Sequence, residues 1–174
     1  MSPRVVLVGM PGTGKSTTGR RLARTLGVPF ADSDTLVERQ AGRSVSEIFA
    51  EAGEAAFREL EAGVIRAALV DFTGVLALGG GAVTDAGVRG ALADARVPVV
   101  LLQASVPTLL ARVGDGQHRP LLSADPQTRL AELAADREAD YARCATWTVL
   151  TDRRTPGQVA AQIAAQLRPQ AAAQ

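Results

Sequence analysis

The chain has 174 residues, of which 47% are hydrophobic and 21% are charged, as expected for one globular domain rather than a disordered chain. The 19 basic residues nearly balance the 18 acidic ones, and aromatic residues make up only 3%, so we expect neither a nucleic-acid nor a membrane partner. One Cys and one His exclude an intrachain disulfide, a Cys-based zinc site and an HExxH metalloprotease.

Short apolar segments alternate with segments of helical periodicity along the chain. The predicted strands are residues 4–8, 28–32, 75–78, 97–103 and 146–150. The predicted helices are residues 15–26, 34–40, 44–50, 54–70, 86–93, 107–113, 127–143 and 156–167. This alternation predicts an α/β fold with a parallel sheet covered on both faces, and ligands at the carboxyl ends of its strands.

The first predicted strand is followed by GMPGTGKST, residues 9–17, which matches the G-x-x-x-x-G-K-[ST] phosphate-loop pattern between a strand and a helix. Its glycines let backbone N–H groups turn inward, and the helix N-terminus adds its dipole. Lys15, the only lysine of the chain, can reach the β- and γ-phosphates, and the Ser16 hydroxyl can bind Mg²⁺. The pattern favours a nucleoside triphosphate site over a plain glycine turn, but does not separate a kinase from a hydrolase or a switch.

The second predicted strand leads into Asp32 and Asp34. Residues two apart on a strand share a face, so we expect both carboxylates to point toward the phosphate loop. One carboxylate can hold magnesium through water while the other orients and deprotonates an acceptor hydroxyl. The alternative is that Asp34 only caps the next helix. Beside a phosphate loop, we favour the functional interpretation.

The segment FRELE, residues 57–61, places Arg58 within pairing distance of both Glu54 and Glu61 on a helix. The spacing leaves open whether this is a surface network or a guanidinium directed into a pocket. Three glycines at residues 79–81 permit close approach of a ligand to the backbone, so we favour a binding surface over a plain turn.

Residues 112–124 carry glycines before Arg119, which predicts a mobile lid that brings this arginine onto the transferring phosphoryl group. The alternative is an ordinary exposed loop, and we expect His118 to lie on its surface. Arg137 falls on the next predicted helix. Arg154 follows the last predicted strand, where an arginine could stack on a base.

These motifs, taken in chain order as GMPGTGKST, D-x-D, FRELE, LGGGA, RPLL and RRTP, resemble the shikimate kinase family of nucleoside-monophosphate-kinase-like P-loop proteins. The resemblance covers about residues 5–167, while residues 114–118 and the end of the chain depart from the family pattern. It implies a three-layer P-loop kinase fold with a five-stranded parallel sheet in order 2-3-1-4-5, helices on both faces and a mobile lid. We expect a single domain over residues 1–168, a lid at about 112–124, a substrate-binding helical region at about 33–61 and a disordered tail at 169–174.

The resemblance also implies the reaction and its residues. ATP, with Mg²⁺ as cofactor, would phosphorylate the 3-hydroxyl of shikimate in aromatic amino-acid (chorismate) biosynthesis. The implied ATP contacts are Gly12, Thr13, Gly14, Lys15, Ser16, Thr17, Arg112, Arg119 and Arg154. The implied substrate contacts are Asp34, Arg58, Gly80 and Arg137, with both arginines on the carboxylate. The implied metal residues are Ser16 and Asp32, and the implied catalytic residues are Lys15, Asp34 as the base, and Arg119.

Two other functions remain open on the sequence. A gluconate or other small-metabolite kinase would also bind an acid and hydroxyl groups, although LGGGA and FRELE favour shikimate. A non-catalytic ATP-binding regulatory module would have little reason to carry Asp34, Arg58, Arg119 and Arg137 together. We expect a cytoplasmic monomer.

Overall fold

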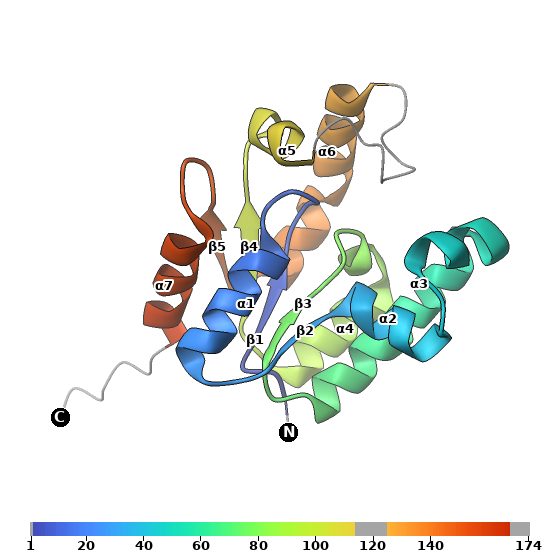
Figure 1. Ribbon diagram of the computed structural model, residues 1–174, viewed down its shortest axis with the longest axis horizontal. Coiled ribbons are helices and arrows are strands. Elements are labelled where there is room, and N and C mark those ends of the chain that lie inside the picture. The colour runs from blue at the N-terminus through green and yellow to red at the C-terminus, as the bar shows by residue number, and fades with distance from the viewer. Residues whose placement is uncertain (1, 114–124, 168–174) are drawn as a thin grey trace.

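The computed structural model describes residues 2–113 and 125–167 (Figure 1). Five parallel strands form one sheet in the order β2-β3-β1-β4-β5. The strands are β1 (Val5–Val8), β2 (Phe30–Asp32), β3 (Val75–Ala77), β4 (Val99–Gln103) and β5 (Trp147–Leu150). The predicted fold class and strand order are therefore confirmed.

Helices flank the sheet on both sides (Figure 1). They are α1 (Lys15–Leu26), α2 (Ser33–Ala41), α3 (Val45–Asp71), the short 3-10 helix η1 (Ala82–Thr84), α4 (Ala86–Ala95), α5 (Val106–Val113), α6 (Pro126–Cys144) and α7 (Pro156–Leu167). Residues 114–124 of the lid predicted at about 112–124, and the whole tail predicted at 169–174, lie outside the described residues. No helix in the described part of the chain is long and apolar enough to cross a membrane.

The central strand β1 supplies side chains to two separate cores because its residues alternate between the faces of the sheet. Val5 and Leu7 pack with apolar residues of α1 and α7. Val6 and Val8 pack with residues of α3, α4, α5 and α6. All four are at most 1% exposed, so burial on both faces accounts for the uninterrupted apolar run in the sequence.

The two helices predicted at 44–50 and 54–70 form one helical run, α3, with a kink at Gly53. This glycine has φ 80° and ψ 176°, a backbone conformation that L-residues with a side chain rarely adopt. At the start of α3, the Ser44 side chain accepts from the Glu47 backbone N–H and the Glu47 carboxylate accepts from Ser44. This capping box fixes where the helix begins.

Candidate active site

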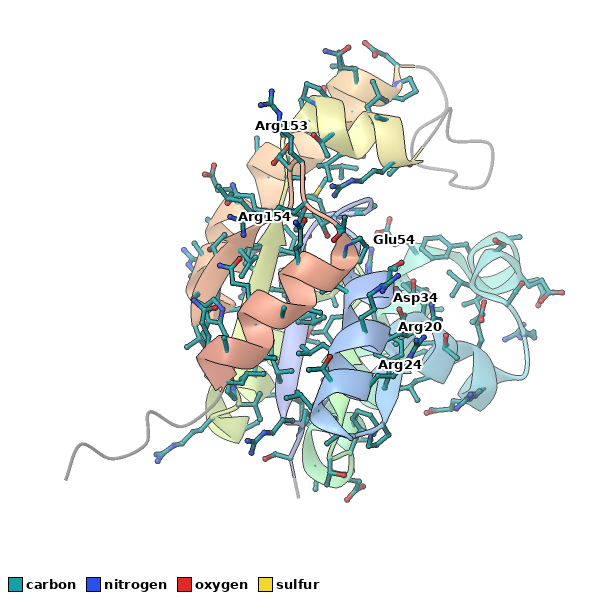
Figure 2. The ribbon with its side chains drawn as sticks, turned by 60° about the vertical axis from the view of Figure 1, so that its left-hand side comes forward. Arg20, Arg24, Asp34, Glu54, Arg153 and Arg154 are labelled. Atoms are coloured by element: carbon teal, nitrogen blue, oxygen red, sulfur yellow. The ribbon has the colours of Figure 1, made fainter. Side chains whose placement is uncertain are left out.

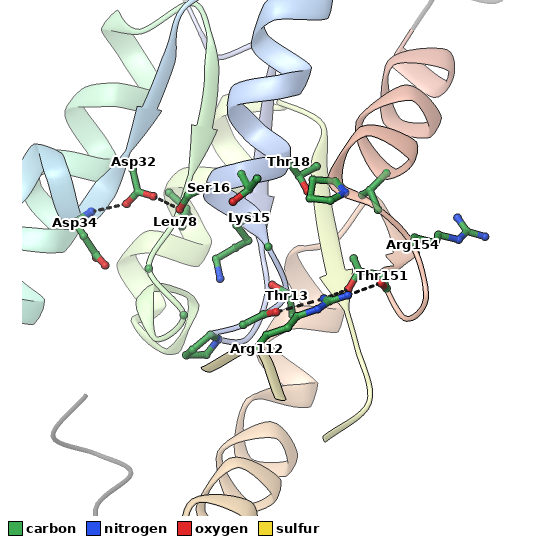
Figure 3. Close-up of a pocket in the computed structure, with 18 residues that line it drawn as sticks. Thr13, Lys15, Ser16, Thr18, Asp32, Asp34, Leu78, Arg112, Thr151 and Arg154 are labelled. Atoms are coloured by element: carbon green, nitrogen blue, oxygen red, sulfur yellow. Dashed lines mark hydrogen bonds between the residues drawn. The ribbon is translucent and has the colours of Figure 1, made fainter. Parts of the chain in front are cut away.

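A pocket of about 450 Å³ lies at the carboxyl ends of the strands, around the loop between β1 and α1 (Figure 3). The predicted site residues that line it are Gly12, Thr13, Gly14, Lys15, Ser16, Thr17, Asp32, Asp34, Gly80, Arg112 and Arg154. Arg58 and Arg137 belong to an adjoining cluster described below. Arg119 lies outside the described residues.

The phosphate loop is shaped by glycines that no other residue could replace without strain. Gly12 has φ 86°, and a Cβ there would lie 2.8 Å from Val113 Cγ2. The Lys15 ammonium donates to the carbonyl oxygens of Gly9 at 2.7 Å and Met10 at 3.0 Å. Thr13 Oγ1 donates to the same Met10 oxygen at 2.8 Å. These hydrogen bonds close the loop on itself, and the Lys15 ammonium lies at the wall of the pocket.

Ser16, Asp32 and Asp34 are joined by hydrogen bonds at the end of β2 (Figure 3). Ser16 Oγ donates to Asp32 Oδ2 at 2.6 Å, and the Asp34 backbone N–H donates to Asp32 Oδ1 at 3.1 Å. Asp32, not Asp34, is the N-cap of α2. Asp34 lies in the first helical turn, so the expectation that both carboxylates share a strand face is wrong, although both line the pocket.

The Arg58 guanidinium binds one buried and one exposed carboxylate. It donates to Glu61 Oε2 at 2.6 Å and to Glu54 Oε1 at 3.3 Å, and the three side chains are 21%, 2% and 55% exposed respectively. Burial raises the pKa of Glu61, while the nearby charge of Arg58 lowers it. Among the described residues, Glu61 Oε1 has no hydrogen-bond partner. Arg58 therefore pairs with a buried carboxylate as well as an exposed one, and it does not itself line the pocket around the phosphate loop.

Two of the three glycines after β3, Gly79 and Gly81, give space to charged side chains of the protein itself. A Cβ at Gly79 would lie 2.9 Å from Asp34 Oδ1 and closer still to Glu61 Oε1. A Cβ at Gly81 would overlap the Arg58 guanidinium. Glycine at these positions therefore lets two carboxylates and a guanidinium converge beside the pocket.

Two hydrogen-bonding residues around these glycines were missed by the sequence analysis. Ser33, fully buried, accepts the Gly79 backbone N–H at 2.8 Å. Tyr141, 4% exposed, donates its hydroxyl to the Gly80 carbonyl at 2.5 Å. Burial raises the pKa of Tyr141 to about 12, against the opposing effect of Arg137.

Arg137 and Tyr141 are four residues apart on α6, so they share one face of that helix. Arg137 is only 8% exposed. Arginine side chains are seldom buried to this extent without a partner, so this burial indicates that the guanidinium has one. The i,i+4 spacing of an arginine and a tyrosine was the signal that could have linked the two residues in the sequence.

On the other side of the pocket, Arg112 ties α5 to the loop after β5. Its guanidinium donates to Thr151 Oγ1 at 2.9 Å, Thr151 O at 2.7 Å and Gly12 O at 3.3 Å. Arg153 and Arg154 project from the same loop (Figure 2), and the Arg154 side chain donates to Gln162 Oε1 on α7. Arg112 therefore connects the phosphate loop with the loop that carries Arg154.

Asp152, which the sequence analysis did not single out, makes a second contact between α5 and the loop after β5. Its carboxylate accepts from the Ser105 backbone N–H at 3.1 Å, from Ser105 Oγ at 2.6 Å and from Thr108 Oγ1 at 2.5 Å. These hydrogen bonds lower the pKa of Asp152 to about 2. Asp152 thus anchors the start of α5 to the loop after β5.

The pocket offers two side-chain oxygens, those of Ser16 and Asp32, as ligands for magnesium. The described residues contain no cluster of three or more His, Cys, Asp or Glu side chains that could hold a metal ion. Ser16 Oγ and Asp32 Oδ2, 2.6 Å apart, are oxygen donors of the kind that Mg²⁺ prefers, and Mg²⁺ bound with substrate phosphates needs only one or two of them. The donor set therefore fits magnesium.

A phosphate loop between β1 and α1, a sheet in order 2-3-1-4-5 and an adjoining cluster of carboxylates and guanidinium groups define a P-loop kinase of small molecules. The shikimate kinase family model matches residues 11–168. The chain belongs to the shikimate kinase family.

Individual relatives agree with this assignment. The chain is 51% identical over 168 residues to a shikimate kinase of Mycobacterium ulcerans, covering 96% of this chain and 90% of the relative. Its structure is similar to that of a shikimate kinase from Acinetobacter baumannii in complex with shikimate, with a TM-score of 0.88, 36% identity and coverage of 94% and 90% of the two chains. A gluconokinase from Sinorhizobium meliloti shares only the fold, with a TM-score of 0.63 and 18% identity over 95% of this chain and 91% of that chain.

Proposed function

We propose that this chain transfers the γ-phosphoryl group of ATP to the 3-hydroxyl of shikimate. The observation that carries the proposal is that one pocket is lined both by the phosphate loop and by Asp34 and Gly80 of the acceptor side. A phosphoryl donor and an alcohol acceptor bound there would be held next to each other, and this positioning is the main contribution of a kinase to its reaction.

On the donor side, the backbone N–H groups of the phosphate loop from Gly12 to Thr17 bind the phosphates of ATP. Lys15 leaves the carbonyl oxygens of its own loop to contact the β- and γ-phosphates. Arg112 and Arg154 flank the adenine, since both line the pocket next to the loop after β5. Arg119 neutralises the charge of the transferring phosphoryl group.

Ser16, through its hydroxyl, and Asp32, through its carboxylate, would hold Mg²⁺. When bound, the ion neutralises charge on the β- and γ-phosphates. The Asp32 side chain already accepts from Ser16 Oγ and from the Asp34 backbone, so its carboxylate is held in place before any ligand binds.

On the acceptor side, Arg58 and Arg137 bind the carboxylate of shikimate, because a guanidinium offers paired donors that match a carboxylate. Asp34 accepts hydrogen bonds from the hydroxyl groups and takes the proton of the 3-hydroxyl as the oxygen attacks phosphorus. Gly80 contributes its backbone N–H. Glu61 holds Arg58 in place through the 2.6 Å ion pair.

The experiment that tests this proposal is a coupled ADP-release assay with Mg-ATP and, in turn, shikimate, gluconate, nucleoside monophosphates or no acceptor. ADP release that depends on shikimate alone supports it. Release with gluconate would assign the acceptor pocket to another small acid. Binding of ATP without any acceptor-dependent release would favour the regulatory-module alternative. We also propose a cytoplasmic monomer, which light scattering coupled to size exclusion and cell fractionation would test.

A further inference from the structure

The Gly80 carbonyl is bound by a side chain from a distant part of the chain. The Tyr141 hydroxyl donates to it at 2.5 Å across a separation of 61 residues. The ring is 4% exposed, so the hydroxyl approaches from the protein interior rather than from solvent. A hydrogen bond of this kind fixes the orientation of the peptide group between Gly80 and Gly81.

Side chains hold two peptide groups of the glycine loop, those between Leu78 and Gly79 and between Gly80 and Gly81. The peptide group between them carries the Gly80 N–H, and its Gly79 carbonyl accepts the Ala82 backbone N–H at 3.1 Å. Ser33 Oγ accepts the Gly79 N–H at 2.8 Å, and Tyr141 binds the Gly80 carbonyl. The Gly80 N–H between them has no hydrogen-bond partner within residues 2–113 and 125–167, and Gly80 lines the pocket. Three consecutive glycines would otherwise sample many conformations. Holding two of their peptide groups reduces the conformational entropy that the loop loses when a ligand binds.

Tyr141 also stands beside the buried arginine of the acceptor cluster. Arg137 precedes it by one helical turn on α6, and its positive charge acts on the tyrosine hydroxyl. Arg137 and the glycine loop come from different elements, α6 and the segment after β3, which the Tyr141–Gly80 hydrogen bond joins directly. The bond therefore joins the helix that carries Arg137 to the loop that carries the Gly80 N–H.

We propose that Tyr141 is a positioning residue for the acceptor: its hydroxyl holds the Gly80 carbonyl so that the Gly80 N–H and the Arg137 guanidinium bind shikimate in a fixed mutual geometry. The proposal rests on the proposed function, because it takes shikimate as the acceptor. Tyr141 itself does not line the pocket around the phosphate loop. Its loss should therefore weaken acceptor binding more than it slows the chemical step.

The test is Tyr141→Phe, which keeps the ring in the core and removes only the hydroxyl. We expect KM for shikimate to rise roughly tenfold, because the Gly80 carbonyl loses its partner and the loop its anchor. We expect kcat and KM for ATP to stay within about twofold of wild type. Thr146→Val is the control, since it removes a hydroxyl that accepts the Val99 N–H at 3.0 Å, at the start of β4. The control should leave KM for shikimate unchanged.

A second measurement uses the fact that Tyr141 is the only tyrosine of the chain. Protein of wild-type sequence grown with 3-fluorotyrosine carries a single fluorine signal, which reports directly on this ring. Shikimate should shift that signal, and gluconate should not. This measurement needs no substitution, so it decides the question even if Tyr141→Phe does not fold.

An unchanged KM for shikimate in Tyr141→Phe would overturn the proposal, as would a fluorine signal that saturating shikimate does not move. A parallel loss of kcat and of affinity for both substrates, with the same loss in Thr146→Val, would show that the hydroxyl serves only stability. Failure of the proposed function looks different, because wild-type protein would then show no shikimate-dependent ADP release at all.

Discussion

Arg58 donates to Glu61 at 2.6 Å, and the carboxylate is almost fully buried while the guanidinium is 21% exposed. Glu61 therefore holds the Arg58 guanidinium from the buried side, while the exposed side of the guanidinium can bind a second anion. Glu54 occupies part of that exposed side at 3.3 Å, from an exposed position. A substrate carboxylate can replace Glu54 at low cost, whereas replacing Glu61 would leave a buried charge without its partner.

This difference predicts unequal effects of two substitutions that each remove one negative charge beside Arg58. Glu61→Gln should raise KM for shikimate roughly tenfold or more, because the guanidinium loses its fixed partner. Glu54→Gln should change it less than about threefold, because exposed ion pairs contribute little. Steady-state kinetics at saturating ATP measures both. Equal effects of the two variants would contradict the assignment of Glu61 as the anchor.

Asp152 gives a prediction for stability against pH. Hydrogen bonds from Ser105 and Thr108 lower its pKa from an ordinary 3.8 to about 2 in the folded chain. The unfolded chain therefore binds this proton more tightly, so the contribution of Asp152 to stability is present above the unfolded pKa and is lost as the pH falls toward the folded pKa.

The expected result is a difference in Tm between wild type and Asp152→Asn that is constant above about pH 5 and shrinks between about pH 4 and pH 2. Thermal unfolding followed by circular dichroism over this range measures it. Asp94→Asn, an exposed position on α4, controls for the loss of one surface charge. A difference that grows on acidification would show that the hydrogen bonds around Asp152 do not stabilise its ionised form.

Local patterns were enough to predict the α/β class with its parallel sheet and the phosphate loop, while the strand order came from the resemblance to a known family. The strands are short buried runs, and the residues around Lys15 form one continuous motif between β1 and α1. Such features depend on neighbours in the sequence and can be recognised there. The boundary between β2 and α2 was harder to predict, since a shift of one or two residues decides whether Asp32 or Asp34 caps α2.

The supporting residues of the acceptor side could not be predicted in the same way. Ser33 and Gly79 are 46 residues apart, and Tyr141 and Gly80 are 61 residues apart. Nothing in the sequence around a lone serine or tyrosine indicates which distant backbone group it will bind. These contacts join α2 and α6 to the glycines that follow β3, so they depend on the arrangement of the whole fold.

Asp34 is predicted to be needed for turnover and not for ATP binding. Asp34→Asn keeps the shape of the side chain but removes the base, so kcat should fall by a factor of about 100 or more. The dissociation constant of ADP, measured by calorimetry, should stay within about twofold because the phosphate loop is unchanged. Turnover near that of wild type would show that another group accepts the proton.

Lys15 should matter for catalysis far more than for folding. Its ammonium donates to two backbone carbonyls of the loop, at 2.7 and 3.0 Å, but these lie at the pocket wall and not in the hydrophobic core. Lys15→Met should therefore reduce kcat on the order of 100-fold or more, because a positive charge on the phosphates is lost during transfer. The free energy of unfolding should fall by less than about 1 kcal/mol.

Two further variants help to interpret Lys15→Met: one keeps the charge at position 15 but changes its geometry, and the other removes a cation elsewhere on the same helix. Lys15→Arg keeps the charge but replaces a compact ammonium by a planar guanidinium, and we expect it to remain strongly impaired because the loop is closed around the smaller group. Arg24→Met, in the last turn of the same helix, removes an exposed cation far from the loop and should leave kcat unchanged. Urea denaturation of all three variants supplies the stability comparison. A Lys15→Met protein that unfolds at much lower urea than Arg24→Met would mean that the ammonium holds the loop together, and that its catalytic loss is secondary to that role.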